Sequence, residues 1–257
     1  MRGGKLGASL ATVISIVIAL VLLAYVPWSV ARHTNQVRER TLAEARTLNA
    51  EMESVWDYVN AQQDIINYDL DGSYHFRGVY CTVAAKGVAQ RFMGKTDYVV
   101  RYVRENPRSG TDYPDEYEAQ AIAAWRDAEV AETHSFTQYD GVTSLRYTSV
   151  ILIKGNCLKC HGGPAGEKDE TGYYKEGMST GDLAGLASIV IPMASYESEV
   201  AGLVMQDVLL MLALVTAVGG AAWVAVHMWV VRPLRQVNEA TRAIGSGDFS
   251  ARIGLMG

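Results

Sequence analysis

The sequence predicts an α+β domain with a mostly antiparallel sheet, placed in the chain between two transmembrane helices. Two apolar runs, residues 6–26 and 208–231, each reach the ~20 residues that an α-helix needs to cross a bilayer. Between them, stretches with helical periodicity alternate with short stretches of β-branched and aromatic residues. The composition agrees, because 49% hydrophobic residues and a mean hydropathy of +0.04 suit a few spans plus one folded domain.

The first apolar run follows a short basic N-terminus that carries Arg2 and Lys5. Trp28 lies at its outer end, where amphipathic rings favour the membrane interface. The run is longer than the apolar core of a signal peptide, and residues 27–31 make a poor cleavage site. We therefore expect an uncleaved anchor and assign residues 1–31 to the cytoplasmic N-terminus and the first transmembrane helix.

The segment between the spans divides into helices and strands. Residues 32–67 hold no Gly or Pro and are rich in Glu, Arg, Ala and Leu, which predicts a helix that continues out of the membrane. Asp71-Gly72 ends that pattern, and Asp140-Gly141 is a hairpin signal between two strands. The remaining expected elements are helices over residues 80–93 and 114–129 and strands over residues 97–104, 135–139, 143–153 and 183–191. We expect the helices to cover one face of the sheet.

The second apolar run, which we assign to a transmembrane helix over residues 206–231, is followed by Arg232 and Arg235. The basic residues beside both spans predict that both termini are cytoplasmic and that residues 32–205 form an extracytoplasmic domain. His227 lies inside this span and is the kind of intramembrane ionisable residue that can be functional. A neutral histidine at a helix interface is the more common case.

Residues 232–257 begin with an amphipathic helix. Leu234, Val237, Thr241 and Ile244 have the a–d spacing of a short parallel coiled coil, which requires a partner helix and so predicts a homodimer. This segment, entered through Arg-Pro-Leu, resembles the first helix and connector of a HAMP signal-relay module. Such a module needs a second helix, so we expect either a fragment of a longer receptor or an incomplete module without a relay function.

Composition also limits the functional classes. The net charge of −5 and the pI of about 5.6 give no electrostatic reason to expect a nucleic-acid partner. No acid–base pair or activated nucleophile stands out in the sequence, and we expect no enzyme activity.

The strongest chemical signal is the C-x-x-C-H motif formed by Cys157, Cys160 and His161. Two thiols three positions apart can each add to one vinyl group of a porphyrin, and the adjacent histidine can then reach the iron as the proximal ligand. In bacteria this covalent attachment takes place outside the cytoplasm, which agrees with the predicted topology. With three cysteines in the chain, a chance match is improbable.

Two other chemistries remain as alternatives. Cys81 would complete a Cys3His zinc set, although a histidine directly after the second cysteine is badly placed to bind the same tetrahedral ion. A thioredoxin-like dithiol would need an opening helix in a βαβ unit, whereas Gly162-Gly163-Pro164 follows the motif.

Roughly residues 40–200 carry a family resemblance beyond the motif itself. The matching stretches are residues 156–162, 172–177, 181–185 and 191–192, with Tyr80-Cys81 upstream. They resemble the bacterial haem-c, PAS-like sensor domains that precede histidine kinases and methyl-accepting chemoreceptors. The chain departs from that family in the loop before Pro114, where Asp112-Tyr113 stands in place of a second Asn.

The resemblance implies one covalent haem c, with Cys157 and Cys160 as thioethers and His161 as the proximal iron ligand. It also implies a cysteine at the head of a helix as the distal ligand, which is Cys81 in this chain. A thiolate on ferric iron would lower the reduction potential, whereas the alternative for Cys81 is an ordinary buried cysteine. Weaker candidates for the distal position are His75, His134, Met93, Met178 and Met193; His33 lies too close to the first span.

These observations predict a redox or gas sensor in the bacterial inner membrane, with a cytoplasmic kinase or chemoreceptor segment as its output. The alternative is a membrane-tethered monohaem electron-transfer cytochrome that serves a redox partner without signalling. The sequence encoded after Gly257 would discriminate between the two.

Overall fold

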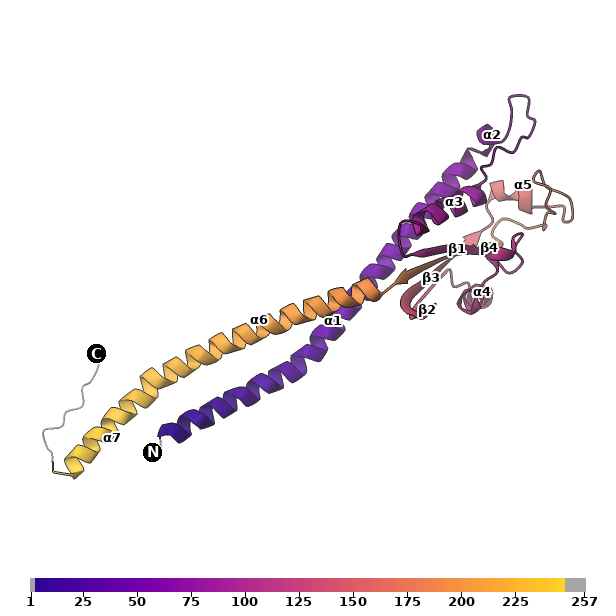
Figure 1. Ribbon diagram of the computed structural model, residues 1–257. Coiled ribbons are helices and arrows are strands. Elements are labelled where there is room, and N and C mark those ends of the chain that lie inside the picture. Colours follow the sequence, from indigo (N-terminus) through magenta and orange to yellow (C-terminus); the bar gives the residue numbers. More distant parts are fainter. Residues whose placement is uncertain (1–2, 248–257) are drawn as a thin grey trace. The chain divides into compact units, whose positions relative to one another are not determined.

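The computed structural model describes residues 3–247 and confirms the α+β prediction (Figure 1). The chain divides into two compact units, one of residues 34–198 and the other of residues 1–33 together with 199–257. Helices are found at α1 (Gly3–Ala61), α2 (Gln63–Ile66), α3 (Cys81–Met93), α4 (Glu116–Ala128), α5 (Leu158–His161), α6 (Ala194–Val226) and α7 (Arg232–Gly245). Shorter helical turns are η1 (Gly110–Asp112), η2 (Gly155–Cys157) and the π-helical turn η3 (His227–Val231).

Four antiparallel strands form one sheet in the order β1-β4-β3-β2. They are β1 (Val99–Val103), β2 (Glu132–Tyr139), β3 (Val142–Leu152) and β4 (Leu183–Pro192). The predicted hairpin is confirmed, because Asp140 and Gly141 join β2 to β3 with φ angles of 47° and 80°. Two successive positive φ angles are typical of the tight hairpin turns whose twist matches that of the flanking strands.

Helices α1 and α3 lie on one face of the sheet. Arg46 of α1 donates to Glu132 of β2 with an Nη2–Oε1 distance of 2.6 Å. Trp56 of α1 packs against Tyr102 of β1 with 5.4 Å between ring centroids. Tyr102 pairs with Ala187 of β4, so this face also carries the side chain of Ala187.

Helix α4 covers the opposite face, so the prediction that helices cover one face is wrong. Val103 and Leu186 lie opposite each other in β1 and β4 and pack with Ala121 and Ile122 of α4. Successive side chains of a strand point to opposite faces. Residues 185–191 of β4 are therefore all buried, as expected of an apolar central strand that is covered on both sides.

The first turn of α4 is fixed to the sheet by a buried ionic cluster. Asp115 and Glu118 form a reciprocal capping box, in which Glu118 accepts from the Asp115 backbone N–H at 2.9 Å. The Glu118 side chain is 0% exposed and lies 3.3 Å from Arg101 of β1 and 3.7 Å from Arg146 of β3. Arg146 also donates to Asp115 at 2.7 Å. The cluster joins the helix to two strands.

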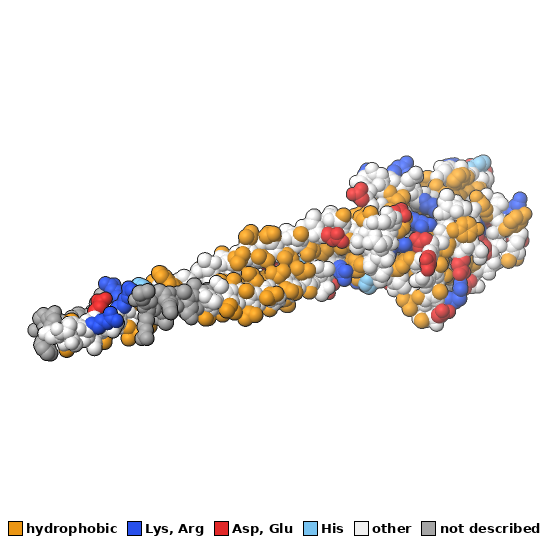
Figure 2. Space-filling model, turned by 60° about the horizontal axis from the view of Figure 1, so that its bottom comes forward, with side chains coloured by type: hydrophobic (Ala, Val, Ile, Leu, Met, Phe, Trp, Pro, Cys, Tyr) orange, Lys and Arg blue, Asp and Glu red, His pale blue; other side chains and the backbone are white. Residues whose placement is uncertain are grey.

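The second unit contains the N-terminal part of α1 and most of the continuous helix from Ala194 to Gly245, and the two candidate membrane spans lie in these two helices. Hydrophobic side chains cover long stretches of both helices (Figure 2). Asp207 of α6 accepts hydrogen bonds from α1, at 2.8 Å from Ser29 Oγ, and lies 2.9 Å from His33 Nε2. The unbroken helix α1 confirms that the first apolar run continues directly into the helical segment that follows it.

Helix α7 confirms the helix predicted after the second span. Its apolar side chains Leu234, Val237 and Ile244 are exposed in the single chain. Inside η3, the ring of His227 stacks on Trp223 with 5.4 Å between centroids. The predicted connector after Gly245 lies mostly outside the described residues, which end at residue 247.

Candidate functional site

Three strand ends meet at one edge of the sheet and position the C-x-x-C-H motif. The motif follows the C-terminal end of β3, and residues 176–182 lead into the N-terminal end of β4. Leu152 of β3 pairs with Leu183 of β4, and Val103 of β1 pairs with Leu186. Because these neighbours are antiparallel, the segment after β1 lies beside the segment before β4. Residues from three distant parts of the sequence are thereby brought together.

The two motif cysteines lie at the two ends of one helical turn. Cys157 ends η2, and Cys160 lies in α5 three positions later. Residues three apart occupy neighbouring positions on one side of a helix. The Cys157 sulfur accepts from the Lys154 backbone N–H at 3.4 Å, and both cysteines are partly buried.

Gly162 allows the chain to leave this turn closely packed. A Cβ atom at Gly162 would lie 2.6 Å from the Leu158 carbonyl oxygen and 3.0 Å from Leu158 Cβ. Only a glycine fits there without displacing the turn. The glycine of the C-x-x-C-H-G stretch therefore has a steric role in holding the motif.

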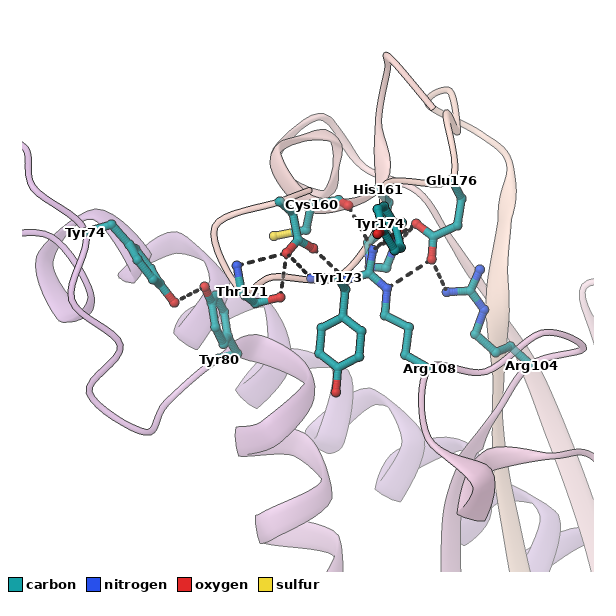
Figure 3. Close-up of polar contacts among 11 residues, drawn as sticks. Tyr74, Tyr80, Arg104, Arg108, Cys160, His161, Thr171, Tyr173, Tyr174 and Glu176 are labelled. Atoms are coloured by element: carbon teal, nitrogen blue, oxygen red, sulfur yellow. Dashed lines mark hydrogen bonds and ion pairs between the residues drawn. The ribbon is translucent and has the colours of Figure 1, made fainter. Parts of the chain in front are cut away.

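One ring nitrogen of His161 contacts the carboxylate of Glu176. Its Nδ1 atom lies 2.8 Å from Oε2 of Glu176, and the side chain is 25% exposed (Figure 3). Burial lowers the pKa of His161, as do Arg108 and Arg104, and Glu176 opposes this effect. A neutral imidazole whose Nδ1–H donates to a carboxylate keeps a lone pair on Nε2, which is the form that binds a metal.

Two arginines hold Glu176 in place. Arg108 donates from Nε to Oε1 and from Nη2 to Oε2, each at 3.0 Å, and Arg104 Nη1 lies 3.4 Å from Oε1 (Figure 3). Burial raises the pKa of Glu176, but the hydrogen bonds from Arg108 and His161 outweigh it and the net pKa is lowered. Glu176 is therefore an anion beside the proximal histidine candidate.

Arg108 connects the motif to the loop that follows it. Its guanidinium donates to the Cys160 carbonyl at 2.9 Å and to Asp169 at 2.7 Å. It also lies over the Tyr173 ring, 5.3 Å from the centroid. No local pattern in the sequence indicates a role for Arg108, because its contacts depend on the pairing of β1 with β4.

Two loops of the same backbone conformation flank the site. Tyr68 bridges Tyr74 in the first loop, and Lys168 bridges Tyr174 in the second. In the first loop, the Asp69 N–H donates to the Ser73 carbonyl oxygen at 2.9 Å. In the second, the Asp169 N–H donates to the Tyr173 carbonyl oxygen at 2.8 Å. The corresponding glycines, at residues 72 and 172, have φ angles of +80° and +84°. Both loops have the sequence Asp-x-x-Gly-x-Tyr, and this repeat is the signal that could have identified them as a pair.

The first loop contacts the motif and the start of α3. Lys159, inside the motif, lies 2.7 Å from Asp64 and 5.4 Å from the centroid of the Tyr68 ring. The Tyr68 hydroxyl donates to Glu170 of the second loop. Tyr80, directly before α3, hydrogen-bonds Tyr74 through its hydroxyl (Figure 3). An aromatic group thus lies between the motif and the helix that begins with Cys81.

The candidates for the distal iron ligand lie in different parts of the domain. The backbone of Cys81 begins α3, but its side chain lies outside the described part, so its role stays a prediction. Met178 is beside the motif, where its N–H donates to the His161 carbonyl at 2.8 Å. His75 lies on the first loop, 3.3 Å from Asp69. The remaining candidates lie on or beside the sheet: Met93 accepts from the Val100 N–H, Met193 is buried at the end of β4, and His134 is exposed on β2.

The arrangement fits a covalently held haem. It places two partly buried cysteines on one helical turn, and Glu176 engages Nδ1 of the adjacent histidine, which leaves Nε2 as the ring nitrogen for a metal. Among the side chains that the structure describes, no group of three or more His, Cys, Asp or Glu is placed to hold a metal ion. Cys81 would be required for the zinc alternative, and its side chain is not among them.

Comparison with known proteins supports the resemblance found in the sequence. Residues 34–192 match the model of the Tll0287-like family, and residues 225–257 match the HAMP domain. A comparison with curated proteins gives no match. Among solved structures, the cyanobacterial heme-protein Tll0287 is similar at 16% identity and a TM-score of 0.46, over 60% of this chain and 95% of that one.

The combination of a sensor-type domain, two candidate spans and a HAMP domain points to signal transduction at a membrane. The family match extends over more than half of the chain. The chain therefore belongs to the Tll0287-like family and carries a HAMP domain over residues 225–257.

Proposed function

We propose that the chain is a membrane-anchored c-type haem protein that senses redox state or a gas outside the cytoplasm. The observation that carries the proposal is the geometry of the motif. Cys157 and Cys160 share one helical turn, and Glu176 occupies Nδ1 of His161 so that Nε2 can bind iron.

The residues of the chain have separate roles in this proposal. The Cys157 and Cys160 thiols would hold a haem as two thioethers, each formed by addition of S–H across one vinyl C=C bond with no group released. His161 would be the proximal iron ligand, and Cys81 is the proposed distal ligand. The haem would supply a one-electron redox centre. We assign no catalytic reaction to the chain.

Covalent attachment is tested on the full chain produced with c-type maturation. Haem should stay with the polypeptide on a denaturing gel, and the Cys157→Ser, Cys160→Ser double variant should lose it. His161→Gly should keep the covalent haem but change its spectrum, with partial recovery by added imidazole. Haem that separates from the wild-type chain under denaturing conditions would contradict the proposal.

The distal ligand is tested by Cys81→Ser in the same full chain. A thiolate ligand predicts a low-spin ferric spectrum with thiolate character that disappears in the variant. Met178→Leu is the matched control beside the motif. If Cys81→Ser leaves the spectrum unchanged and Met178→Leu changes it, the distal assignment moves to Met178.

Signalling is supported by the connectivity of the chain. The loop that holds Glu176 leads into β4, and α6 begins two residues after β4 ends. A shift of this loop caused by a change of iron ligand would therefore be transmitted to the second span through a short segment of the chain. We propose a homodimer in the bacterial inner membrane with cytoplasmic termini, whose exposed α7 residues Leu234, Val237 and Ile244 pair between copies.

This proposal predicts that haem oxidation state changes the distance between paired second spans. Spin labels at one exposed position of α6 in the reconstituted full chain would measure that distance in the ferric and ferrous states. The Cys157→Ser, Cys160→Ser double variant is the control and should show one distance under both conditions. Identical distances in the haem-loaded protein would exclude this signalling route.

Electron transfer without signalling is the second candidate. Exposed aromatic side chains on the two loops, Phe76 (55% exposed) and Tyr174 (65% exposed), favour it because they would bring a redox partner to the haem edge. Fast haem reduction by quinol in isolated membranes, together with an unchanged span distance, would favour this function over sensing.

A further inference from the structure

We propose that Glu176 is a positioning residue for the proximal ligand, and that it lowers the reduction potential of the haem. The inference rests on the proposed function, because it needs a haem bound at the motif. Glu176 would accept the Nδ1–H of His161, fix the orientation of the imidazole and increase its electron donation through Nε2. The spacing of the C-x-x-C-H motif says nothing about this residue.

The contact between Glu176 and His161 has the geometry of a charge-assisted hydrogen bond. The Oε2–Nδ1 distance is 2.8 Å, and both side chains are about three-quarters buried. Partial burial makes such a bond stronger than it would be in water. A carboxylate on the far nitrogen of a metal-binding histidine fixes its tautomer and increases its basicity as a ligand.

Two arginines hold the carboxylate that contacts the histidine. Arg108 binds both oxygens of Glu176 at 3.0 Å, and Arg104 approaches Oε1 at 3.4 Å. Arg108 also donates to the Cys160 carbonyl at 2.9 Å. One guanidinium therefore binds both the Glu176 carboxylate and the backbone next to His161. This arrangement preorganises the hydrogen bond between Glu176 and His161.

The charges around the site have opposite effects on the haem. The anionic Glu176 stabilises the more positive ferric iron and lowers the potential. Arg104 and Arg108 draw charge away from Glu176 and so limit this effect. Removal of the Glu176 charge should raise the potential, and removal of the Arg104 charge should lower it. General damage to the loop would not produce shifts of opposite sign.

The test compares three variants of the full haem-loaded chain with the wild type. Glu176→Gln removes the anion while keeping the side-chain shape, and Arg104→Gln removes one cation. Glu167→Gln is the matched control, because Glu167 lies in the same loop, is 61% exposed and has its nearest cation, Lys175, at 3.9 Å. The readouts are the midpoint potential and the ferric EPR g values, which report the axial ligand field.

We expect Glu176→Gln to change the equilibrium constant of haem reduction at least tenfold towards the reduced state, which is about 59 mV for one electron. Its EPR g values should shift as well, while Glu167→Gln leaves both readouts close to wild type. A potential of Glu176→Gln within the shift of Glu167→Gln would overturn the inference. If Glu176→Gln does not retain haem, Arg104→Gln decides, because an unchanged or raised potential in that variant also overturns it.

Failure of the proposed function and failure of the role of Glu176 give different results. A wild-type chain without haem refutes the proposed function and makes the potential unmeasurable. A wild-type chain with covalent haem, and variants whose potentials equal its own, refutes only the role of Glu176.

Discussion

Glu118 is the residue whose substitution most directly tests the packing of α4 against the sheet. Its carboxylate is 0% exposed, lies 3.3 Å from Arg101 and 3.7 Å from Arg146, and accepts the Asp115 N–H at 2.9 Å. Glu118→Gln keeps the shape and can keep the capping hydrogen bond, since Gln also forms capping boxes. The variant therefore isolates the loss of the buried negative charge.

The size of the effect follows from what remains around the site. Loss of one partner from a buried ion pair costs about 3–5 kcal/mol of the free energy of unfolding. Arg146 keeps its 2.7 Å contact with Asp115, so the lower end, about 3 kcal/mol, is expected. For a domain of this size, each kcal/mol lowers the melting temperature by about 2–4 °C, so a decrease of about 6–12 °C should follow.

Thermal unfolding of the full chain, followed by near-ultraviolet circular dichroism, measures this change. Glu116→Gln is the matched control, because Glu116 occupies the same first turn of α4 but is exposed. Both substitutions remove one negative charge from the N-terminus of the helix, and only one removes a buried ion pair. A melting temperature for Glu118→Gln equal to that of Glu116→Gln would refute the reasoning.

Further predictions concern the motif turn and acid stability. Gly162→Ala should lower the haem content per chain, because its Cβ would lie 2.6 Å from the Leu158 carbonyl oxygen; Gly155→Ala, with no atom within 4 Å, should retain wild-type content. Equal haem contents would show that the turn tolerates a side chain at Gly162. The hydrogen bond from Arg46 lowers the pKa of Glu132 below its usual value of 4.5. The ionised Glu132 therefore stabilises the folded state fully above about pH 4.5, and this stabilisation is lost as the pH falls through the lower pKa of the folded state. Glu132→Gln should unfold at a lower temperature than wild type at neutral pH, and the difference should disappear in acid; a constant difference across that range would contradict the assignment.

Most of the secondary structure was predicted correctly from local patterns in the sequence, and the layer arrangement was not. The Asp140-Gly141 hairpin and the long helix after the first span were predicted correctly because turn chemistry and helix propensity act locally. The placement of helices on both faces was missed. The apolar run of β4 carries that information, since a strand covered on both sides has no polar alternation.

The candidate site shows the same division. The two cysteines and the histidine lie close together in the sequence, within residues 157–161, and could be identified by their spacing alone. Arg104 and Arg108 lie roughly 70 residues from Glu176, and they meet it because Val103 pairs with Leu186 across β1 and β4. Strand register determines that proximity, so no local pattern could indicate it. Glu176 fell within a family-matching stretch, but its bond to His161 was visible only in the structure.

The central claim is a haem held covalently by Cys157 and Cys160. The most direct measurement is the pyridine haemochrome spectrum of the full chain after c-type maturation, taken before and after extraction with acidified acetone. We predict a haem c spectrum that remains with the polypeptide after extraction, at one haem per chain, and that is absent from the Cys157→Ser, Cys160→Ser double variant. Haem that passes entirely into the acetone, or a matured chain that contains none, would contradict the claim.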